Sequence, residues 1–283
     1  MNTYQALRHR NAWLELPGRG LIRATGEDAA RLLHAMSTAN VHALQSGEQV
    51  YAFFLNAQGR ILADAWIDRR EDHYLIDTEP VSRKALYDHL DKFIIADDVT
   101  LEDVSDEQKA VSIEAPGGTY FSAVGFENAQ RLYMGATEEP HIEYTLATAE
   151  DAEIVRLENG CPRYGVDITE KYLVQETQQM QAVSFTKGCY LGQEIVERVR
   201  ARGAVHKHLV RLEIEGAEPP AAGTEFMADT AKAGVITSAA YSPAQKAVVA
   251  LGYINVAFEN SAKPLTLSGD LSRRVLVQRP HTG

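Results

Sequence analysis

The pattern of apolar residues changes near His206, and this change constrains the fold more than any other feature of the chain. Before it, apolar residues recur at helix spacing in some segments and at strand spacing in others. After it, short apolar runs are separated by turns rich in Pro, Gly, Ser and Asn, which is typical of a small β-barrel. The predicted barrel strands are 208–214, 234–241, 247–254 and 274–277. We therefore predict an α+β fold for the residues before 204 and a C-terminal β-barrel for residues 204–283.

A first module is predicted at residues 18–103. Two helices, one starting near Thr25 and one at Ser82, have apolar residues at helical spacing. The segment Asn-Ala-Gln-Gly at 56–59 indicates a hairpin. The order of helices and strands is that of a ferredoxin-like sheet with one added strand. The predicted strands are 20–24, 50–55, 60–67, 74–77 and 99–102.

A second module is predicted from residues 1–17 and 104–203. Strands are expected at 110–114 and within 120–132. Thr148 is expected to cap a helix that ends before Gly160. Residues 166–186 are polar and irregular, which predicts a loop that crosses the functional site.

The composition is that of an ordinary folded protein. Of 283 residues, 45% are hydrophobic and 24% are charged, which is enough for packed cores. The net charge of −11 argues against a direct nucleic-acid partner and against binding to an anionic membrane. No run of about 18 apolar residues occurs, and the N-terminal residues lack the apolar region of a secretory signal. Two cysteines do not form a disulfide framework, so we expect a cytoplasmic location.

Residues 187–198 have the most unusual sequence of the chain, Lys-Gly-Cys-Tyr-Leu-Gly-Gln-Glu-Ile-Val-Glu-Arg. The pattern becomes helical, and Glu194 and Arg198 have the spacing of an i, i+4 ion pair. If the helix starts near Cys189, the thiol faces the positive end of the helix dipole, with Lys187 two residues upstream. Both effects favour the reactive thiolate. The alternative is a small apolar residue that packs under the helix start.

This motif resembles the signature of the YgfZ family, folate-binding proteins related to the glycine cleavage T-protein, an aminomethyltransferase. Three other segments match in the expected order, at 26–33, at the hairpin 56–64 and at 156–165. The resemblance covers roughly residues 15 to 275. It implies ferredoxin-like modules of the T-protein folate-binding type before the barrel.

The resemblance implies tetrahydrofolate, or a derivative, as the cofactor, bound in a cleft between the first two modules. The implied role is accessory to iron–sulfur cluster assembly or repair, and thereby to the activity of iron–sulfur tRNA-modifying enzymes. The partners would be iron–sulfur assembly proteins or client enzymes. Whether the chain is an enzyme stays open, since the alternatives are an aminomethyltransferase of the T-protein type and a scaffold that senses folate. Against the transferase, the chain is short and lacks a Gly-Tyr-Thr-Gly-Glu-Asp-like pterin segment.

Two acidic residues are candidate folate contacts. Asp64 follows the Gly-containing hairpin at the position of an aspartate that the T-protein uses, so the resemblance implies a catalytic or cofactor-binding role. Strand alternation alone is also compatible with a polar residue on an outer face. Glu158 matches a glutamate that grips the pterin ring in the T-protein, and a carboxylate can accept two parallel N–H bonds from such an edge. The alternative is a solvated glutamate near a helix C-terminus.

The motif at 187–198 supplies the remaining candidates. Cys189 is the second candidate catalytic residue, and Lys187 and Gln193 are candidate cofactor-binding residues. We expect no metal site, because His206 and His208 share a strand face without a third ligand at metal spacing.

A basic stretch follows the motif in this acidic chain. It is either a solvated helix face or a region that attracts the anionic polyglutamate tail of folate. Cys161, beside Pro162, is predicted to pack in the interior. The basic residues are Arg198, Arg200, Arg202, Lys207 and Arg211.

Overall fold

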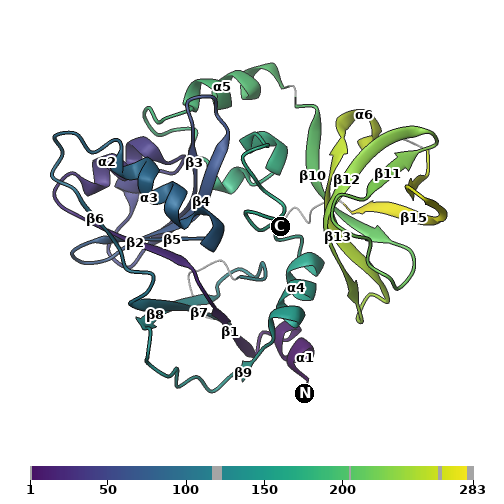
Figure 1. The fold of residues 1–283 in the computed structure, drawn as a ribbon, viewed down its shortest axis with the longest axis horizontal. Coiled ribbons are helices and arrows are strands. Elements are labelled where there is room, and N and C mark those ends of the chain that lie inside the picture. The colour runs from purple at the N-terminus through teal and green to yellow at the C-terminus, as the bar shows by residue number, and fades with distance from the viewer. Residues whose placement is uncertain (1, 117–122, 204, 261–262, 279–283) are drawn as a thin grey trace.

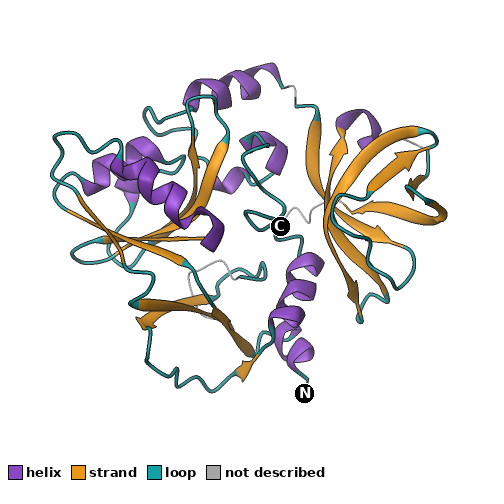
Figure 2. Cartoon of the chain, viewed as in Figure 1, coloured by secondary structure: helices purple, strands orange, loops and turns teal. Residues whose placement is uncertain are grey.

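The computed structural model describes residues 2–116, 123–203, 205–260 and 263–278. The strands form a five-stranded sheet, a four-stranded sheet and a closed six-stranded barrel. Figure 1 shows the five-stranded sheet on one side of the molecule and the barrel on the other, with helix α4 (Ala149–Glu158) between them. In Figure 2 a second set of helices lies over the five-stranded sheet, on the side of the molecule away from the barrel.

The first module is an antiparallel sheet in the order β3-β4-β5-β2-β6, covered on one face by two helices. The order β6-β2-β5-β4 is that of a ferredoxin-like sheet with one added strand, as predicted, and the structure shows that the added strand is β3, at the edge. Its elements are β2 (Gly20–Thr25), α2 (Ala29–Met36), η1 (Val41–Ala43), β3 (Gln49–Leu55), β4 (Ile61–Arg69), β5 (Tyr74–Thr78), η2 (Pro80–Ser82), α3 (Arg83–Asp91) and β6 (Thr100–Asp103).

Alternation along β4 divides its side chains between two faces. Ala63, Ala65 and Ile67 are in the core between the sheet and the two helices. Asp64 and Trp66 are therefore on the opposite face, which the rest of the chain covers. This division places a carboxylate on the inner side of the molecule.

The second module has the sheet β8-β7-β1-β9, in which β1 and β9 are parallel and the other pairs antiparallel. Because β1 pairs with β7, the N-terminal residues join this sheet. Thr148 accepts a hydrogen bond from the Asp151 amide at 3.1 Å, so it caps α4 as predicted. The predicted strand within 120–132 lies partly outside the described residues, and β8 begins at Gln130. The bounds are α1 (Thr3–Arg8), β1 (Ala12–Leu16), β7 (Gln108–Glu114), β8 (Gln130–Gly135) and β9 (Thr145–Leu146).

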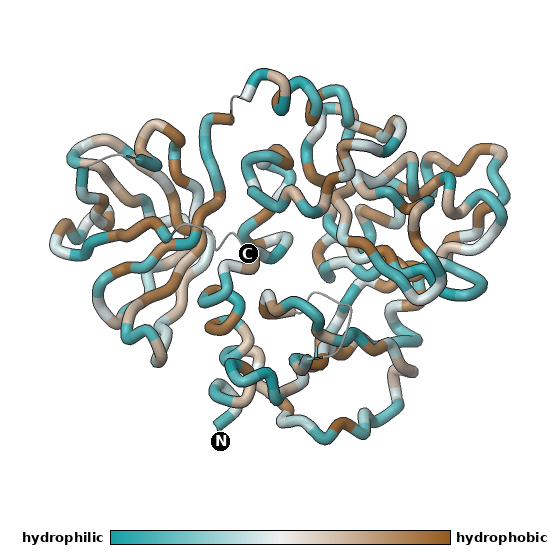
Figure 3. Tube along the Cα trace, turned by 180° about the vertical axis from the view of Figure 1, so that it is seen from behind, coloured by the Kyte–Doolittle hydropathy of each residue, from teal (hydrophilic) through white to brown (hydrophobic). Residues whose placement is uncertain are grey.

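The C-terminal part is a closed barrel in the order β10-β13-β12-β11-β14-β15. The four predicted strands all fall within its longer strands, whereas β11 and β14 have only four and three residues and were missed. Apolar and polar segments both occur along the barrel strands in Figure 3, and the apolar side chains fill the interior. The bounds are β10 (Lys207–Ile214), β11 (Glu225–Ala228), β12 (Ala231–Ser242), β13 (Ala247–Asn255), α6 (Val256–Glu259), β14 (Leu265–Leu267) and β15 (Asp270–Gln278).

The segment between α4 and the barrel packs on the face of the first sheet that α2 and α3 leave uncovered. It contains η3 (Val174–Thr177), η4 (Met180–Ala182) and α5 (Gln193–Arg202). Val174 and Val196 contact a cluster that includes Phe53 and Ile61 of the first sheet. The predicted loop at 166–186 is therefore partly buried and has two short 3-10 turns. Within the described residues, no helix is long and apolar enough to cross a membrane.

Candidate functional site

A cavity of about 990 Å³ lies where the two sheets, α4 and the barrel meet. This volume is suited to a small-molecule ligand or cofactor. The first module, the second module and the barrel all contribute to its wall. Representative wall residues are Tyr51, Asp64, Trp66, Glu158, Cys161 and Arg211.

Asp64 is a buried carboxylic acid in the cavity wall. Its residue is 7% exposed, and the Tyr51 hydroxyl donates a hydrogen bond to Oδ2 at 2.6 Å. Burial raises the pKa of Asp64 to about 7, and the nearby carboxylate of Glu79 adds to the rise. The Tyr51 hydrogen bond and the charge of Arg19 oppose it only in part. Asp64 can therefore hold or release a proton near neutral pH.

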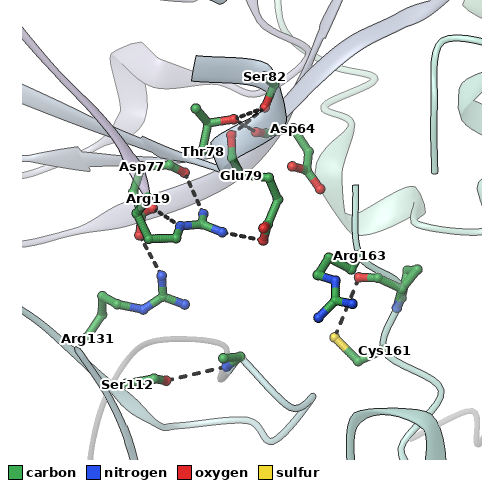
Figure 4. A network of polar contacts seen from close by, with 12 residues as sticks. Arg19, Asp64, Asp77, Thr78, Glu79, Ser82, Ser112, Arg131, Cys161 and Arg163 are labelled. Atoms are coloured by element: carbon green, nitrogen blue, oxygen red, sulfur yellow. Dashed lines mark hydrogen bonds and ion pairs between the residues drawn. The ribbon is translucent and has the colours of Figure 1, made fainter. Parts of the chain in front are cut away.

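A network of ion pairs fixes Glu79 beside Asp64 (Figure 4). Arg19 donates from Nε to Asp77 Oδ1 at 2.5 Å and pairs with Glu79 through a second nitrogen. Arg131 of β8 pairs with the other oxygen of Asp77 at 2.5 Å. Because Asp77 is on β5 and Arg131 is on β8, the network joins the two sheets. Asp77 is fully buried, and each of its two carboxylate oxygens has an arginine partner, which offsets the cost of burying its charge.

Glu158 is buried in the cavity wall at the end of α4, with 6% of the residue exposed. Its Oε1 accepts hydrogen bonds from the Tyr4 hydroxyl and from the Ser242 hydroxyl, the latter at 2.5 Å. Its Oε2 pairs with Arg8 Nε at 3.1 Å. The solvated alternative is therefore wrong. Glu158 links the N-terminal helix α1 and the barrel strand β12 to α4, and the predicted contact with a pterin stays a prediction.

Lys187 has a structural role that the sequence did not indicate. Its ammonium donates to the carbonyls of Ser37 and Ala39, each at 2.7 Å, and to that of His34. These oxygens lie at and just beyond the C-terminus of α2, where the helix dipole favours a cation. Desolvation lowers the pKa of Lys187 to about 8, while the three accepting carbonyls favour its charged form. The side chain fastens the motif to the first module and is not among the residues lining the cavity.

The expectation that Cys189 lies at a helix N-terminus is wrong. Helix α5 begins at Gln193 after the N-cap Gly192, so Cys189 precedes its first turn. Lys187 turns away into the first module. Cys189 is nevertheless exposed, and neither it nor Gln193 is among the residues lining the cavity. The predicted ion pair of Glu194 with Arg198 is present and is exposed on α5.

Two of the segments on which the predicted resemblance rests, the hairpin at 56–64 and the motif at 187–198, contact each other in space. Gly192 has φ +84°, and a Cβ added there would lie 2.8 Å from the carbonyl oxygen of Asn56. A Cβ on Gly59 would lie 2.7 Å from Cβ of Ile195. Only glycine permits this approach of the hairpin to the start of α5. The motif at 187–198 is therefore positioned by the same hairpin that leads into Asp64.

Residues 2–119 match the family model for the GCVT N-terminal domain, and residues 207–278 match that for the glycine cleavage T-protein C-terminal barrel domain. The two matches together cover 190 of the 283 residues, 118 in the first and 72 in the second. The glycine cleavage system aminomethyltransferase T from Bartonella henselae, a solved structure, aligns over 99% of this chain and 89% of that chain. The TM-score is 0.83 at 17% identity, a likeness that establishes the fold alone. The predicted fold class, α+β with a C-terminal barrel, is confirmed.

The curated relatives include proteins named as iron–sulfur cluster assembly factors and a protein named as an aminomethyltransferase. The iron-sulfur cluster assembly factor IBA57 homolog, mitochondrial, of Mycosarcoma maydis is 27% identical over 73% of this chain, and the match spans 59% of that protein. The corresponding factor of Mus musculus is 28% identical over 74% of this chain and 68% of that protein. The aminomethyltransferase of Rubrobacter xylanophilus is 23% identical over 89% of this chain and 78% of that protein. Membership of the YgfZ family itself and a cytoplasmic location stay predictions.

The cavity also has wall residues that the sequence did not single out. Arg19, Tyr51 and Glu79 surround Asp64, and only Tyr51 has a sequence signal, since β3 and β4 were predicted to pair. Cys161, predicted to pack, is partly exposed in this wall. Burial raises the pKa of the Cys161 thiol to about 12, so it is neutral at physiological pH.

Replacing Lys187 with methionine should lower the free energy of unfolding by roughly 2–4 kcal/mol, because buried carbonyls lose their donor. Chemical denaturation of Lys187→Met measures the loss. Lys84→Met is the matched control, since the Lys84 side chain is 85% exposed and should change stability by less than about 0.5 kcal/mol. Equal effects of the two substitutions would show that the Lys187 contacts do not fasten the motif.

Proposed function

We propose that the protein binds tetrahydrofolate, or a derivative, in the central cavity and acts as an accessory factor in iron–sulfur cluster assembly or repair. The observation that supports this best is the position of Asp64 and Glu158. The two residues that match folate contacts of the T-protein lie 94 positions apart in sequence (158 − 64) and line the same cavity. A cavity of about 990 Å³ is large enough for a ligand of this size.

The two carboxyl groups would act differently on a pterin. Glu158 accepts hydrogen bonds from the hydroxyls of Tyr4 and Ser242 and pairs with the half-exposed Arg8. A pterin that donates N–H bonds to Glu158 would share or replace these donors. Asp64, with a pKa of about 7, could donate or accept a proton at the ligand. The site therefore offers a fixed anchor and a group that titrates near neutral pH.

Support for the iron–sulfur role comes from the relatives and from Cys189. Relatives from Mycosarcoma maydis and Mus musculus are named as iron–sulfur cluster assembly factors. Cys189 is exposed, so its thiol is accessible to a partner protein. Buried Lys187 and Tyr190 flank the exposed pair Gly188 and Cys189, which limits the freedom of this short segment. The clients would include iron–sulfur enzymes that modify tRNA.

An aminomethyltransferase of the T-protein type is the second candidate. It is favoured by the proton that Asp64 can exchange near neutral pH and by the relative named aminomethyltransferase. An assay of folate-dependent one-carbon release from an aminomethyl carrier protein separates the two candidates. Release at a catalytic rate would favour the transferase, and its absence together with folate binding would favour the accessory factor.

Replacing Glu158 with alanine should weaken tetrahydrofolate binding about tenfold or more, because a charge-assisted hydrogen bond contributes roughly 1.5–3 kcal/mol. Isothermal titration calorimetry measures the affinity. Tyr4→Phe is the matched control, since it removes one intramolecular bond to Glu158 and leaves the carboxylate in place. Wild-type affinity in Glu158→Ala would rule out the assignment, and equal weakening in both variants would indicate a structural effect.

The accessory role is tested in a strain that lacks its own member of the family. Expression of this protein should restore the activity of the iron–sulfur enzymes that such a strain loses. Failure to restore them, with the protein present at normal level and able to bind folate, would contradict the iron–sulfur role and leave folate binding intact.

A further inference from the structure

The arginines that line the cavity differ in their partners. There are six of them, and five form ion pairs with carboxylates of the chain. Arg211 has no ion pair to any of the described residues. Its Nη2 lies 3.4 Å from Oε1 of Gln245, at the long end of hydrogen bonding, and its buried Nε has no hydrogen-bond partner. The guanidinium of Arg211 thus has donors that no described residue of the chain satisfies.

The position of Arg211 is set by the barrel. Val210 and Leu212 belong to the barrel interior, so alternation along β10 directs Arg211 outward, into the cavity wall. Its Cδ lies 3.7 Å from the point that a Cβ on Gly160 would occupy, so the stem packs beside the end of α4. Burying part of a guanidinium without an acceptor is unfavourable. A structural reason for Arg211 would therefore require an acceptor within the chain.

The C-terminus of α4 does not supply that acceptor. The carbonyls of Val155, Arg156 and Leu157 already accept backbone amides at 3.0, 2.8 and 3.1 Å. The field of the helix C-terminus favours a nearby cation, but it provides Arg211 with no hydrogen bond of its own. Arg211 is instead among the residues that line the ligand cavity.

We propose that Arg211, with Gln245 beside it, is an anion subsite at the barrel end of the cavity and binds a carboxylate of the ligand. A guanidinium offers two parallel N–H donors, which match a carboxylate. That this carboxylate belongs to the glutamate part of folate rests on the proposed function.

The subsite also restricts the shape of the ligand. Asp64 is on β4 of the first sheet and Arg211 is on β10 of the barrel, and Figure 1 shows these strands in separate units on either side of the middle of the molecule. A ligand that contacts both reaches from the first module to the barrel, with a proton-exchanging group near Asp64 and an anionic group near Arg211. Arg211 would then select for ligands that have the anionic end.

Calorimetry with two ligands tests the subsite. Tetrahydrofolate has the glutamate carboxylates, whereas 6-methyltetrahydropterin has the reduced pterin ring and no carboxylate. Arg211→Gln should weaken tetrahydrofolate binding about tenfold to a hundredfold and change 6-methyltetrahydropterin binding less than about twofold. Arg202→Gln, a substitution in the exposed last turn of α5, should change neither. Equal affinities of wild type and Arg211→Gln for tetrahydrofolate, or equal losses for both ligands, would overturn the proposal.

Inorganic phosphate separates failure of the subsite from failure of the proposed function. If wild type does not bind tetrahydrofolate, folate binding is wrong, and the phosphate comparison decides the subsite by itself. Phosphate that raises the melting temperature of wild type and of Arg202→Gln, but not of Arg211→Gln, keeps the anion subsite. Phosphate effects that are equal in all three proteins, or absent from all three, overturn it.

Discussion

Asp64→Asn is expected to be more stable than the wild-type protein at pH 8, by on the order of 3–4 kcal/mol. The native carboxyl has a pKa raised from 3.8 to about 7, so the folded state holds the proton more tightly than the unfolded state does. Stability of the wild type therefore falls as the pH rises from about 4 to about 7, and the loss remains above that range. Asparagine stays neutral and can still accept the Tyr51 hydrogen bond.

The gain in stability should depend on pH. It should be about 2–3 kcal/mol larger at pH 8 than at pH 5, where much of the native Asp64 population is already neutral. Urea denaturation of both proteins at the two pH values measures the difference. Asp91→Asn, at an exposed position of α3, should show nearly equal effects at both pH values. A gain for Asp64→Asn that does not change with pH would show that Asp64 is ionised throughout this range.

The same substitution separates folate binding from chemistry. If the protein is an accessory factor, Asp64→Asn should keep folate affinity within a few-fold and still restore iron–sulfur enzymes in cells. If it is a transferase, one-carbon transfer should be lost while binding persists, because a general base acts mainly in the transition state. Aminomethyl transfer by the wild type that disappears in the variant would decide for the transferase.

Local patterns in the sequence predicted the elements that local interactions determine. The four long barrel strands, the cap at Thr148 and the ion pair of Glu194 with Arg198 were predicted and are present. Each depends on residues within a few positions of one another. The short strands β11 and β14 contain too few residues to show an alternating pattern, and the closed barrel pairs them.

Features that depend on distant segments could not be predicted. The start of α5 at Gln193 follows from the contact of Gly192 with the hairpin at Asn56, which is 136 positions away (192 − 56). Lys187 is held by carbonyls around the end of α2, about 150 positions earlier in the chain. The network of Arg19, Asp77 and Arg131 likewise joins two sheets. In each case the spatial neighbour decides the role, and no local pattern encodes it.

Cys161 and Cys189 differ because of their surroundings. Cys161 is a neutral thiol with a pKa raised to about 12, so alkylating reagents should react with it slowly. Cys189 is exposed and should be alkylated first, which mass spectrometry of the iodoacetamide-treated protein can map. Since Cys189 precedes the first turn of α5, its proposed role rests on accessibility and on the buried residues that flank it.

Replacing Cys189 with serine should abolish the restoration of iron–sulfur enzymes in a strain that lacks its own family member. The fold should persist, because the side chain is exposed and serine is of similar size. Tetrahydrofolate affinity should also persist, because Cys189 is not among the residues lining the cavity. Thr186→Ala, at another exposed position of the same segment, should restore the enzymes like the wild type. Full restoration by Cys189→Ser would exclude the thiol from function, whereas loss of activity with unchanged folate binding would place the partner contact outside the ligand cavity.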